Sequence, residues 1–242
     1  MNNPPRPAVP GWLSGLLDLF YPTTIRCIAC KNKLARDDER LLCAACADAL
    51  VLIPAEAPCP RCGQPRAARG CLRCLSEQVE ALDAVYAALF HEDSARGLVH
   101  ALKYDGLREA ARPLADGMAE ALIASREEWD ILAPIPLHRR KMRMRGFNQA
   151  MALAGELGAL CGLPAREMLR RVSDTRQQAS LNAAARHVNM RGAFSPITPM
   201  TGLRVLLVDD VCTTGATAEN AARACKAAGA ARVGLITATR AE

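Results

Sequence analysis

The chain has 242 residues, of which 50% are hydrophobic, so it can bury one full core and carry a smaller appendage, and we expect two domains. No apolar run approaches the roughly 20 residues that a membrane-spanning helix needs, which argues against an integral membrane protein. The formal net charge of +6 is modest, but the basic residues are clustered, and such clusters favour ligands that carry phosphate.

Residues 1–24 are expected to form a leader ahead of the folded domains. Residues 1–10 are rich in proline, and the apolar positions of residues 12–20 fit a short amphipathic helix that packs on the protein rather than on a membrane. The helix contains the acid Asp18, and no small-residue cleavage site follows it, so the leader does not resemble a secretory signal. We therefore expect a cytoplasmic protein.

Eight of the eleven cysteines lie in one short block, and all eight form C-x-x-C pairs. A C-x-x-C turn places two thiolates on one side of a tight knuckle, and two knuckles supply the four sulfurs of a tetrahedral zinc site. We expect residues 25–76 to form a double zinc-ribbon module whose zinc is structural, because a block with few aliphatic residues needs the metal for its folding energy. The expected ligands are Cys27, Cys30, Cys43, Cys46, Cys59, Cys62, Cys71 and Cys74.

Adjacent pairing of the knuckles is the simplest arrangement, with one zinc ion on the first four cysteines and a second on the last four. The spacing leaves open an interleaved arrangement, in which the first knuckle shares its metal with the third. A disulfide scaffold is the rival interpretation, and a reducing cytosol disfavours it. Redox chemistry is also disfavoured, because a series of such pairs exceeds what thioredoxin-type chemistry requires.

After Cys74 the sequence changes to apolar strands that alternate with helices rich in Ala and Leu, and we assign residues 77–242 to the second domain. Strands are expected at 83–90, 130–134, 203–208 and 231–239, and helices at 94–103, 108–124, 147–161 and 218–228. This alternation indicates a three-layer α/β domain with a mostly parallel sheet. Ligands of such sheets bind beyond the carboxyl ends of the strands.

The loop after the second of these strands is strongly basic. Residues 134–149 read Pro-Ile-Pro-Leu-His-Arg-Arg-Lys-Met-Arg-Met-Arg-Gly-Phe-Asn-Gln. Cations fixed beside a pyrophosphate leaving group stabilise the charge that develops as its bond breaks. The same cluster could instead bind a nucleic-acid backbone or form a merely solvated loop. Its cations are Arg139, Arg140, Lys141, Arg143 and Arg145.

The most informative segment includes the third strand. Residues 204–217 read Arg-Val-Leu-Leu-Val-Asp-Asp-Val-Cys-Thr-Thr-Gly-Ala-Thr. The first amides of the helix that follows lack intrahelical partners, and this end attracts phosphate. The adjacent acids Asp209 and Asp210 would repel a bare phosphate, so ribose hydroxyls and a bridging magnesium ion are their candidate ligands. The alternative is an ordinary buried strand that ends in an Asp-rich turn.

Residues 205–217 resemble the phosphoribosyl pyrophosphate (PRPP) motif of the type I phosphoribosyltransferases. The resemblance implies that the two acids hold the ribose 2′- and 3′-hydroxyls and that the following loop wraps the 5′-phosphate. The PRPP-binding residues that it implies in this segment are Asp209, Asp210, Val211, Cys212, Thr213, Thr214, Gly215, Ala216 and Thr217.

Further motifs narrow the resemblance to the ComF family, including its GntX-like members. They are Pro-x-Pro-Leu-His at 134–138, Arg-Gly-Phe-Asn-Gln at 145–149, His-Ala-Leu-Lys-Tyr-Asp-Gly at 100–106, the segment 176–189 and the cysteine knuckles. The match implies a three-layer α/β fold of type I phosphoribosyltransferase type, preceded by a small zinc-ribbon module of four-cysteine sites. It also implies that Arg145, Gly146 and Phe147 form the pyrophosphate loop and that Lys103 assists it.

Two functions fit this site. In the first, an enzyme transfers phosphoribose from magnesium PRPP to a nucleobase or nucleotide and releases pyrophosphate, with Asp209, Asp210, Arg145 and Lys103 as its catalytic residues. In the second, PRPP or a nucleotide is only sensed, and the ComF resemblance implies single-stranded DNA and a competence helicase as partners in DNA uptake. The nucleic-acid surface would then be formed by the knuckles together with Arg139, Arg140, Lys141 and Arg143. A low aromatic content of 4% counts against base stacking as its main source of affinity.

Overall fold

A computed structural model describes residues 26–34, 41–53, 80–172 and 192–241. Its elements in chain order are α2 (Ala44–Asp48), β1 (Ala84–Phe90), α4 (Asp93–Tyr104), η1 (Arg108–Ala110), α5 (Ala111–Ser125), β2 (Ile131–Pro134), α6 (Arg139–Arg145), α7 (Gln149–Cys161), β3 (Leu169–Arg171), β4 (Phe194–Pro196), β5 (Arg204–Cys212), α9 (Ala216–Ala227) and β6 (Arg232–Arg240). Four predictions lie outside the described residues: the leader helix at 12–20, the second set of cysteines (Cys59, Cys62, Cys71 and Cys74), the domain boundary after residue 76 and the segment 176–189.

Four strands form a parallel sheet in the order β1-β6-β5-β2, which confirms the predicted sheet. The central strand β5 is buried on both faces from Val205 to Val208, as parallel strands covered by helices should be. All four strands run in the same direction, so their carboxyl ends meet at one edge of the sheet. A separate antiparallel ribbon pairs β3 with β4. The sequence did not predict this ribbon, because strands of three residues are too short to show an alternating pattern.

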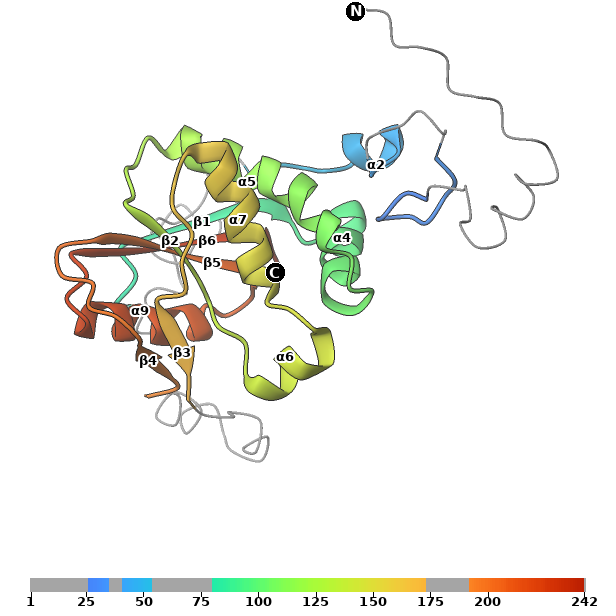
Figure 1. Cartoon of the computed structure of the whole chain (residues 1–242). Coiled ribbons are helices and arrows are strands. Elements are labelled where there is room, and N and C mark those ends of the chain that lie inside the picture. Colours follow the sequence, from blue (N-terminus) through green and yellow to red (C-terminus); the bar gives the residue numbers. More distant parts are fainter. Residues whose placement is uncertain (1–25, 35–40, 54–79, 173–191, 242) are drawn as a thin grey trace, which may run out of the picture.

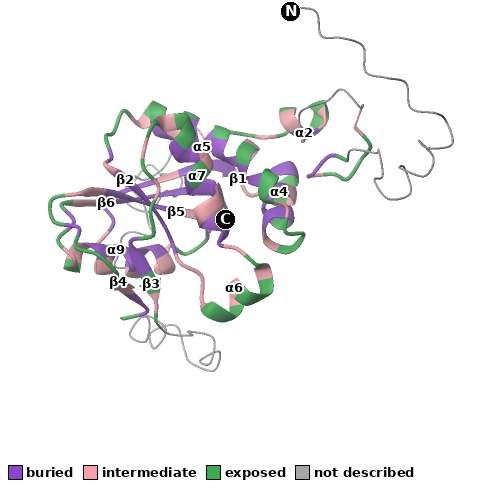
Figure 2. Cartoon of the chain, viewed as in Figure 1, coloured by how far each residue is buried: buried purple, intermediate pink, exposed green. Residues whose placement is uncertain are grey.

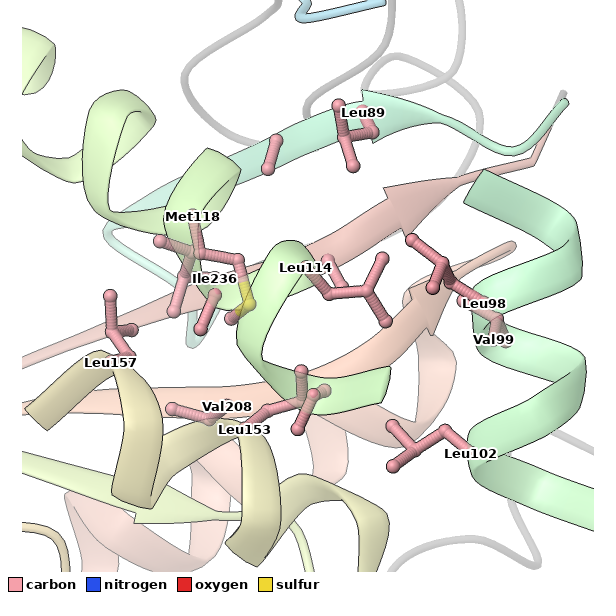
Figure 3. Close-up of a cluster of buried hydrophobic side chains, with 14 of the residues drawn as sticks. Leu89, Leu98, Val99, Leu102, Leu114, Met118, Leu153, Leu157, Val208 and Ile236 are labelled. Carbon is pink, nitrogen blue, oxygen red and sulfur yellow. The ribbon is translucent and has the colours of Figure 1, made fainter. Parts of the chain in front are cut away.

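Helices cover both faces of the sheet and form the expected three layers (Figure 1). On one face, α4, α5 and α7 enclose a core that contains Leu98, Leu114 and Leu153 (Figure 3). On the other face, α9 and the β3-β4 ribbon enclose a second core around Leu207 and Val233. Figure 2 shows the buried strands between these layers and the exposed outer surfaces of the helices. None of the described helices is long and apolar enough to cross a bilayer.

The first pair of cysteine knuckles is built into the core of the second domain. Cys27, Ile28, Leu42 and Cys46 are buried in the same cluster as the apolar residues of α4 and α5. Residues 51–53 run along β1, where Ile53 N donates a 2.9 Å hydrogen bond to the carbonyl of residue 88. The described part of the zinc-ribbon module therefore packs on the α/β domain as one continuous body.

Several element boundaries differ from the prediction for local reasons. Helix α4 begins at Asp93, one residue before the predicted start, and Ser94 is a buried residue of its first turn. The segment expected as one helix from residue 108 is a short 3₁₀ turn followed by α5. The basic segment expected as a loop contains the helix α6, which has no buried residue and hence no apolar periodicity to reveal it. Strand β5 continues past the predicted end at residue 208 to Cys212.

Candidate functional site

The two acids lie on the last residues of β5, at the carboxyl edge of the sheet. Side chains alternate along a strand, so Asp209 and Asp210 point to opposite faces. Asp210 shares its face with Val208 and lies toward α4, where Lys103 Nζ is 2.8 Å from Asp210 Oδ1. The side chains of this pair are only 19% and 11% exposed, so solvent screens their attraction weakly. Thus the structure brings together two residues that are 107 positions apart in sequence.

The other acid is held in an environment that favours its neutral form. Burial and, next, the charge of Asp210 raise the pKa of the Asp209 carboxyl to about 7. A hydrogen bond from Asp210 N to Asp209 Oδ1, at 2.9 Å, and the charges of Lys103 and Lys141 act in the opposite direction. A carboxyl with this pKa gains a full charge when a cation or another positive group binds beside it.

The loop that follows the acids has the features of an anion cradle. Thr213 and Thr214 are exposed, and Gly215 adopts φ +75° at the N-cap of the 12-residue helix α9. The hydroxyl of Thr214 accepts a 3.4 Å hydrogen bond from Ala216 N. Glu219, the acid in the first turn of α9, is buried, and its Oε1 accepts hydrogen bonds from the amides of residues 80 and 81 and from Arg223 Nε.

A buried hydrogen-bond chain reaches the acid pair from two other strands. The Thr239 hydroxyl of β6 is fully buried and donates to the carbonyl oxygen of Asp210 at 3.3 Å, while His91 Nδ1, just beyond β1, lies 2.9 Å from the same hydroxyl. Burial and, after it, the charges of Lys103 and Arg96 lower the pKa of His91, which keeps its imidazole neutral. Sequence reasoning missed both residues, because only the strand order places β6 beside β5 and β1 beside β6.

The basic segment forms α6 at the same edge of the sheet. His138 Nδ1 accepts a 3.3 Å hydrogen bond from Arg140 N at the start of α6, and Gly146, at φ +77°, ends the helix. Of these two residues, Gly146 is the sequence signal for a helix end that the sequence analysis did not use. Arg139, Arg140 and Arg143 are exposed, and Lys141 is partly buried.

The residues of the expected pyrophosphate loop contact the end of α4 and the turn after it. The Arg145 guanidinium lies 5.4 Å from the centre of the Tyr104 ring and donates a 2.9 Å hydrogen bond to Gln149 Oε1. The Arg108 guanidinium lies 4.7 Å from the centre of the Phe147 ring. Among the described contacts, no hydrogen bond or ion pair joins Arg145 to either acid. Of the two cations expected to be catalytic, Lys103 is therefore the one that contacts an acid, Asp210.

Four cysteines form a compact metal-ligand set near α4. The sulfurs of Cys27, Cys30, Cys43 and Cys46 all lie within 4.8 Å of one another, and those of Cys30 and Cys43 are 3.8 Å apart. Tetrahedral zinc with Zn–S bonds of about 2.3 Å has sulfur–sulfur edges of about 3.8 Å, so this set fits zinc. All four thiols are free, which contradicts the disulfide interpretation for these residues and confirms adjacent pairing of the first two knuckles.

The thiols of this set differ in acidity. Burial alone would raise the pKa of Cys27, but hydrogen bonds from the amides of Cys30 and Cys43 lower it to about 6. Burial raises the pKa of the Cys46 thiol to about 12. A metal that binds all four sulfurs as thiolates therefore displaces protons from the site.

Comparison with known proteins gives the same two-part organisation. The double zinc ribbon domain family matches residues 16–77, and the phosphoribosyl transferase domain family matches residues 114–241. The chain is 32% identical over 183 residues to the DNA utilization protein YhgH of Salmonella typhimurium, covering 72% of this chain and 80% of that protein.

Two further relatives carry competence names. Competence protein ComFC of Streptococcus pneumoniae is 26% identical over 202 residues, covering 81% of this chain and 86% of that protein. Competence protein F of Haemophilus influenzae is 34% identical over 120 residues, covering 48% of each chain. Among solved structures, the chain is similar to a glutamine PRPP amidotransferase of B. subtilis, with a TM-score of 0.39, 20% identity and coverage of 54% of this chain and 26% of that chain.

Proposed function

Since this chain belongs to the ComF family, in which a double zinc ribbon precedes a phosphoribosyltransferase domain, we propose that it binds magnesium PRPP and transfers the phosphoribosyl group. The observation that carries the proposal is the contact between Lys103 and Asp210 at the edge of the sheet where the 213–217 loop begins. This arrangement places a buried cation beside carboxylates and an anion cradle, which are the groups that a phosphorylated sugar requires.

The proposed binding mode divides PRPP among three segments. Asp209 and Asp210 accept hydrogen bonds from the ribose hydroxyls, and the loop with the first turn of α9 holds the 5′-phosphate. The pyrophosphate lies toward Lys103 and the loop of Arg145, Gly146 and Phe147. In this mode, Lys103 divides its hydrogen bonds between Asp210 and the pyrophosphate, since an ammonium group has three donors.

In the proposed reaction, the bond from ribose C1 to the pyrophosphate oxygen breaks as a bond forms between C1 and an acceptor nucleophile. Pyrophosphate leaves with the bonding electron pair, and the acceptor releases a proton. The cations Lys103 and Arg145 stabilise the negative charge that grows on the leaving group. Catalysis then rests on orientation and charge stabilisation and needs no nucleophile from the protein. The acceptor we propose is a nucleobase or a nucleotide.

Magnesium is the cofactor that we propose for this site. The oxygens of Asp209 and Asp210 are hard ligands of the kind that the ion prefers. The raised pKa of Asp209 fits a group whose charged form is stabilised when a cation binds. When bound together with PRPP, magnesium would neutralise part of the phosphate charge.

Pyrophosphate release tests the enzymatic proposal. The protein is incubated with magnesium PRPP and a panel of nucleobases and nucleotides, and we expect turnover with at least one acceptor. The double variant Asp209→Asn/Asp210→Asn should abolish it, whereas Asp116→Asn on the exposed surface of α5 should leave it unchanged. Binding of PRPP without pyrophosphate release on any acceptor would contradict catalysis and favour sensing.

A second candidate function is the sensing of PRPP or a nucleotide by a protein that binds single-stranded DNA. The observation that favours it is α6, which presents Arg139, Arg140 and Arg143 to solvent beside the site. The names of the relatives, which refer to DNA utilization and competence, agree with a role in DNA handling. For this function we further propose a competence helicase as partner and a cytoplasmic location. Binding of this kind rests on phosphate contacts, so its affinity should fall steeply with salt.

A further inference from the structure

Helix α4 lies between the first four-cysteine site and the acid pair and contacts both. In Figure 1 the segment that carries α2 lies beside α4. One surface of the helix packs against the cysteine knuckles, and its last turn carries Lys103, which reaches Asp210. Residues 93–104 belong to neither of the two matched family regions, which cover 16–77 and 114–241. The helix is therefore the physical connection between the metal module and the proposed PRPP site.

The contact between the knuckle and α4 is close enough to involve the backbone itself. A Cβ atom placed on Gly97 would lie 2.9 Å from the carbonyl oxygen of Ala29 and 3.1 Å from its Cα. Ala29 lies between the ligands Cys27 and Cys30, so the loop that curls around the metal sits directly on the helix. One turn earlier, the buried Ser94 hydrogen-bonds the ligand Cys46. Both knuckles of the first site thus contact α4 through residues on one helical face.

A second attachment secures the end of the helix. Lys31 follows Cys30 directly, and its ammonium lies 2.7 Å from Asp105 Oδ2 at the C-cap of α4. Lys31 has φ +65°, which turns the chain at this point, and its amide donates to the carbonyl of Cys27 at 2.8 Å. The Lys31 side chain is 52% exposed, so the pair adds little stability. Its effect is to hold Asp105, two residues after Lys103, against the segment that carries the ligand Cys30.

The remaining attachments of α4 leave its orientation dependent on the knuckle. Leu98 and Leu102 pack against Leu114 of α5 (Figure 3), and such apolar contacts are not directional. The metal module adds directional constraints through the backbone contact at Gly97 and the ion pair at Asp105, and the Arg145 guanidinium adds another at Tyr104. If the knuckle opens, the helix loses the two constraints from the metal module, and the position of Lys103 on a nearly buried carboxylate is less well defined.

We propose that the first zinc site positions Lys103 for the phosphorylated ligand. Metal bound by Cys27, Cys30, Cys43 and Cys46 holds α4 in the register that keeps Lys103 on Asp210, so zinc binding and PRPP binding are thermodynamically linked. The inference rests on the proposed function, because PRPP is its ligand. Linkage is reciprocal, so bound PRPP must also raise the affinity for zinc by the same factor.

The variant Gly97→Ala tests the contact. Alanine favours the helix, but its methyl group must push the knuckle away from α4. We expect about a tenfold weaker affinity for magnesium PRPP, in the usual range of such couplings, with zinc content and fold retained. Gly155→Ala in α7 is the matched control, since a Cβ there meets nothing within 4 Å, and its affinity should equal that of the wild type. Calorimetry measures affinity, and elemental analysis measures zinc.

Asp105→Asn provides the second variant, in case Gly97→Ala does not fold. It removes the charge that Lys31 binds without changing the size of the side chain, and it should also weaken magnesium PRPP binding. The reciprocal readout is the zinc affinity of the full-length protein, measured at equilibrium by competition with a chelator. Saturating magnesium PRPP should raise this affinity about tenfold in the wild type and less in both variants.

The outcomes separate this inference from the proposed function. If the wild type binds magnesium PRPP and the folded variants bind it equally well, or if PRPP leaves the zinc affinity unchanged, the linkage is wrong while the proposed function stands. If the wild type does not bind PRPP, the proposed function fails. Hydrogen exchange of the α4 amides then tests the positioning itself. Zinc removal should increase exchange in residues 98–104, and unchanged exchange there overturns the inference.

Discussion

The ammonium group of Lys103 lies 2.8 Å from Asp210 Oδ1 and joins helix α4 to the carboxyl end of strand β5. Both side chains are largely buried and have lost most of their hydration. The attraction between the two charges offsets that loss. Asp210 is also held through its carbonyl oxygen by Thr239, which fixes the backbone beneath the carboxylate. The pair is therefore both a structural contact and part of the proposed PRPP site.

We expect Lys103→Met to cost about 3 kcal/mol of unfolding free energy, because it leaves Asp210 unpaired in a largely buried position. Adding Asp210→Asn to that variant should recover part of the loss, since the amide carries no charge. Urea denaturation of the wild type, both single variants and the double variant gives the coupling energy. Additive losses would show that the two groups do not interact.

The pKa of Asp209, about 7, predicts a pH dependence of ligand binding. Below pH 7 the carboxyl is protonated, and magnesium PRPP must displace the proton, so affinity should rise from pH 6 to pH 7.5 and then level off. Calorimetry over this range measures the effect. The phosphates of PRPP titrate nearby, so the slope is compared with that of Asp209→Asn. An equal slope in this variant would assign the dependence to the ligand.

The same pKa makes a prediction about stability. Between pH of about 4 and 7, the folded chain retains a proton on Asp209 that the unfolded chain has released. This group therefore lowers the free energy of unfolding as the pH rises through that window. Asp209→Asn should remove this contribution, and the difference between variant and wild type should widen toward pH 7. A constant difference across the window would contradict the raised pKa.

Zinc content tests the metal assignment. Two C-x-x-C pairs supply one tetrahedral site, and the chain has four such pairs, so the purified chain should contain about two zinc ions. Cys46→Ala should lower the content by one ion and loosen the packing on α4, since Cys46 is buried in the core shared with that helix. Elemental analysis and tryptic digestion measure the two effects. Metal-free protein that resists digestion as well as the wild type would refute a structural role.

The pair between Asp130 and Arg204 joins the amino ends of β2 and β5. Arg204 donates to Asp130 through both its backbone amide and its side chain, each at 2.7 Å. Asp130→Ala should cost about 2 kcal/mol in urea denaturation, whereas Asp116→Ala, which breaks an exposed pair with Arg112, should cost under about 0.5 kcal/mol. Hydrogen bonds from Arg204 lower the pKa of Asp130, so this contribution is present above pH of about 4 and is lost at lower pH. Equal costs for the two variants would contradict this difference.

Helix α6 allows a test of DNA binding. Arg140→Gln and Arg143→Gln should each weaken binding of single-stranded DNA and lower the slope of log affinity against log salt by about 1. Arg126→Gln, at the end of α5 and on the opposite edge of the sheet, should leave both unchanged. Fluorescence anisotropy at several salt concentrations measures them. Affinity that is insensitive to salt would exclude the proposed phosphate contacts.

The sequence alone determined the features that depend on local order. Continuous apolar runs and helical periodicity predicted the four parallel strands and the helices between them, and the C-x-x-C spacing predicted the cluster of Cys27, Cys30, Cys43 and Cys46. Asp209 and Asp210 were expected at the binding edge because ligands of parallel sheets bind where the strands end. Helix α6 was missed because none of its residues is buried and they follow no apolar pattern.

Only the tertiary structure decided which of these residues meet. Strand order brings Thr239 to the backbone of Asp210 and His91 to the hydroxyl of Thr239, and the packing of α4 brings Lys103 to the Asp210 carboxylate. The close approach of Ala29 to Gly97 depends on how two segments that are distant in sequence pack together. Such contacts are determined by the arrangement of whole elements in space, whereas periodicity and spacing report only the neighbours along the chain.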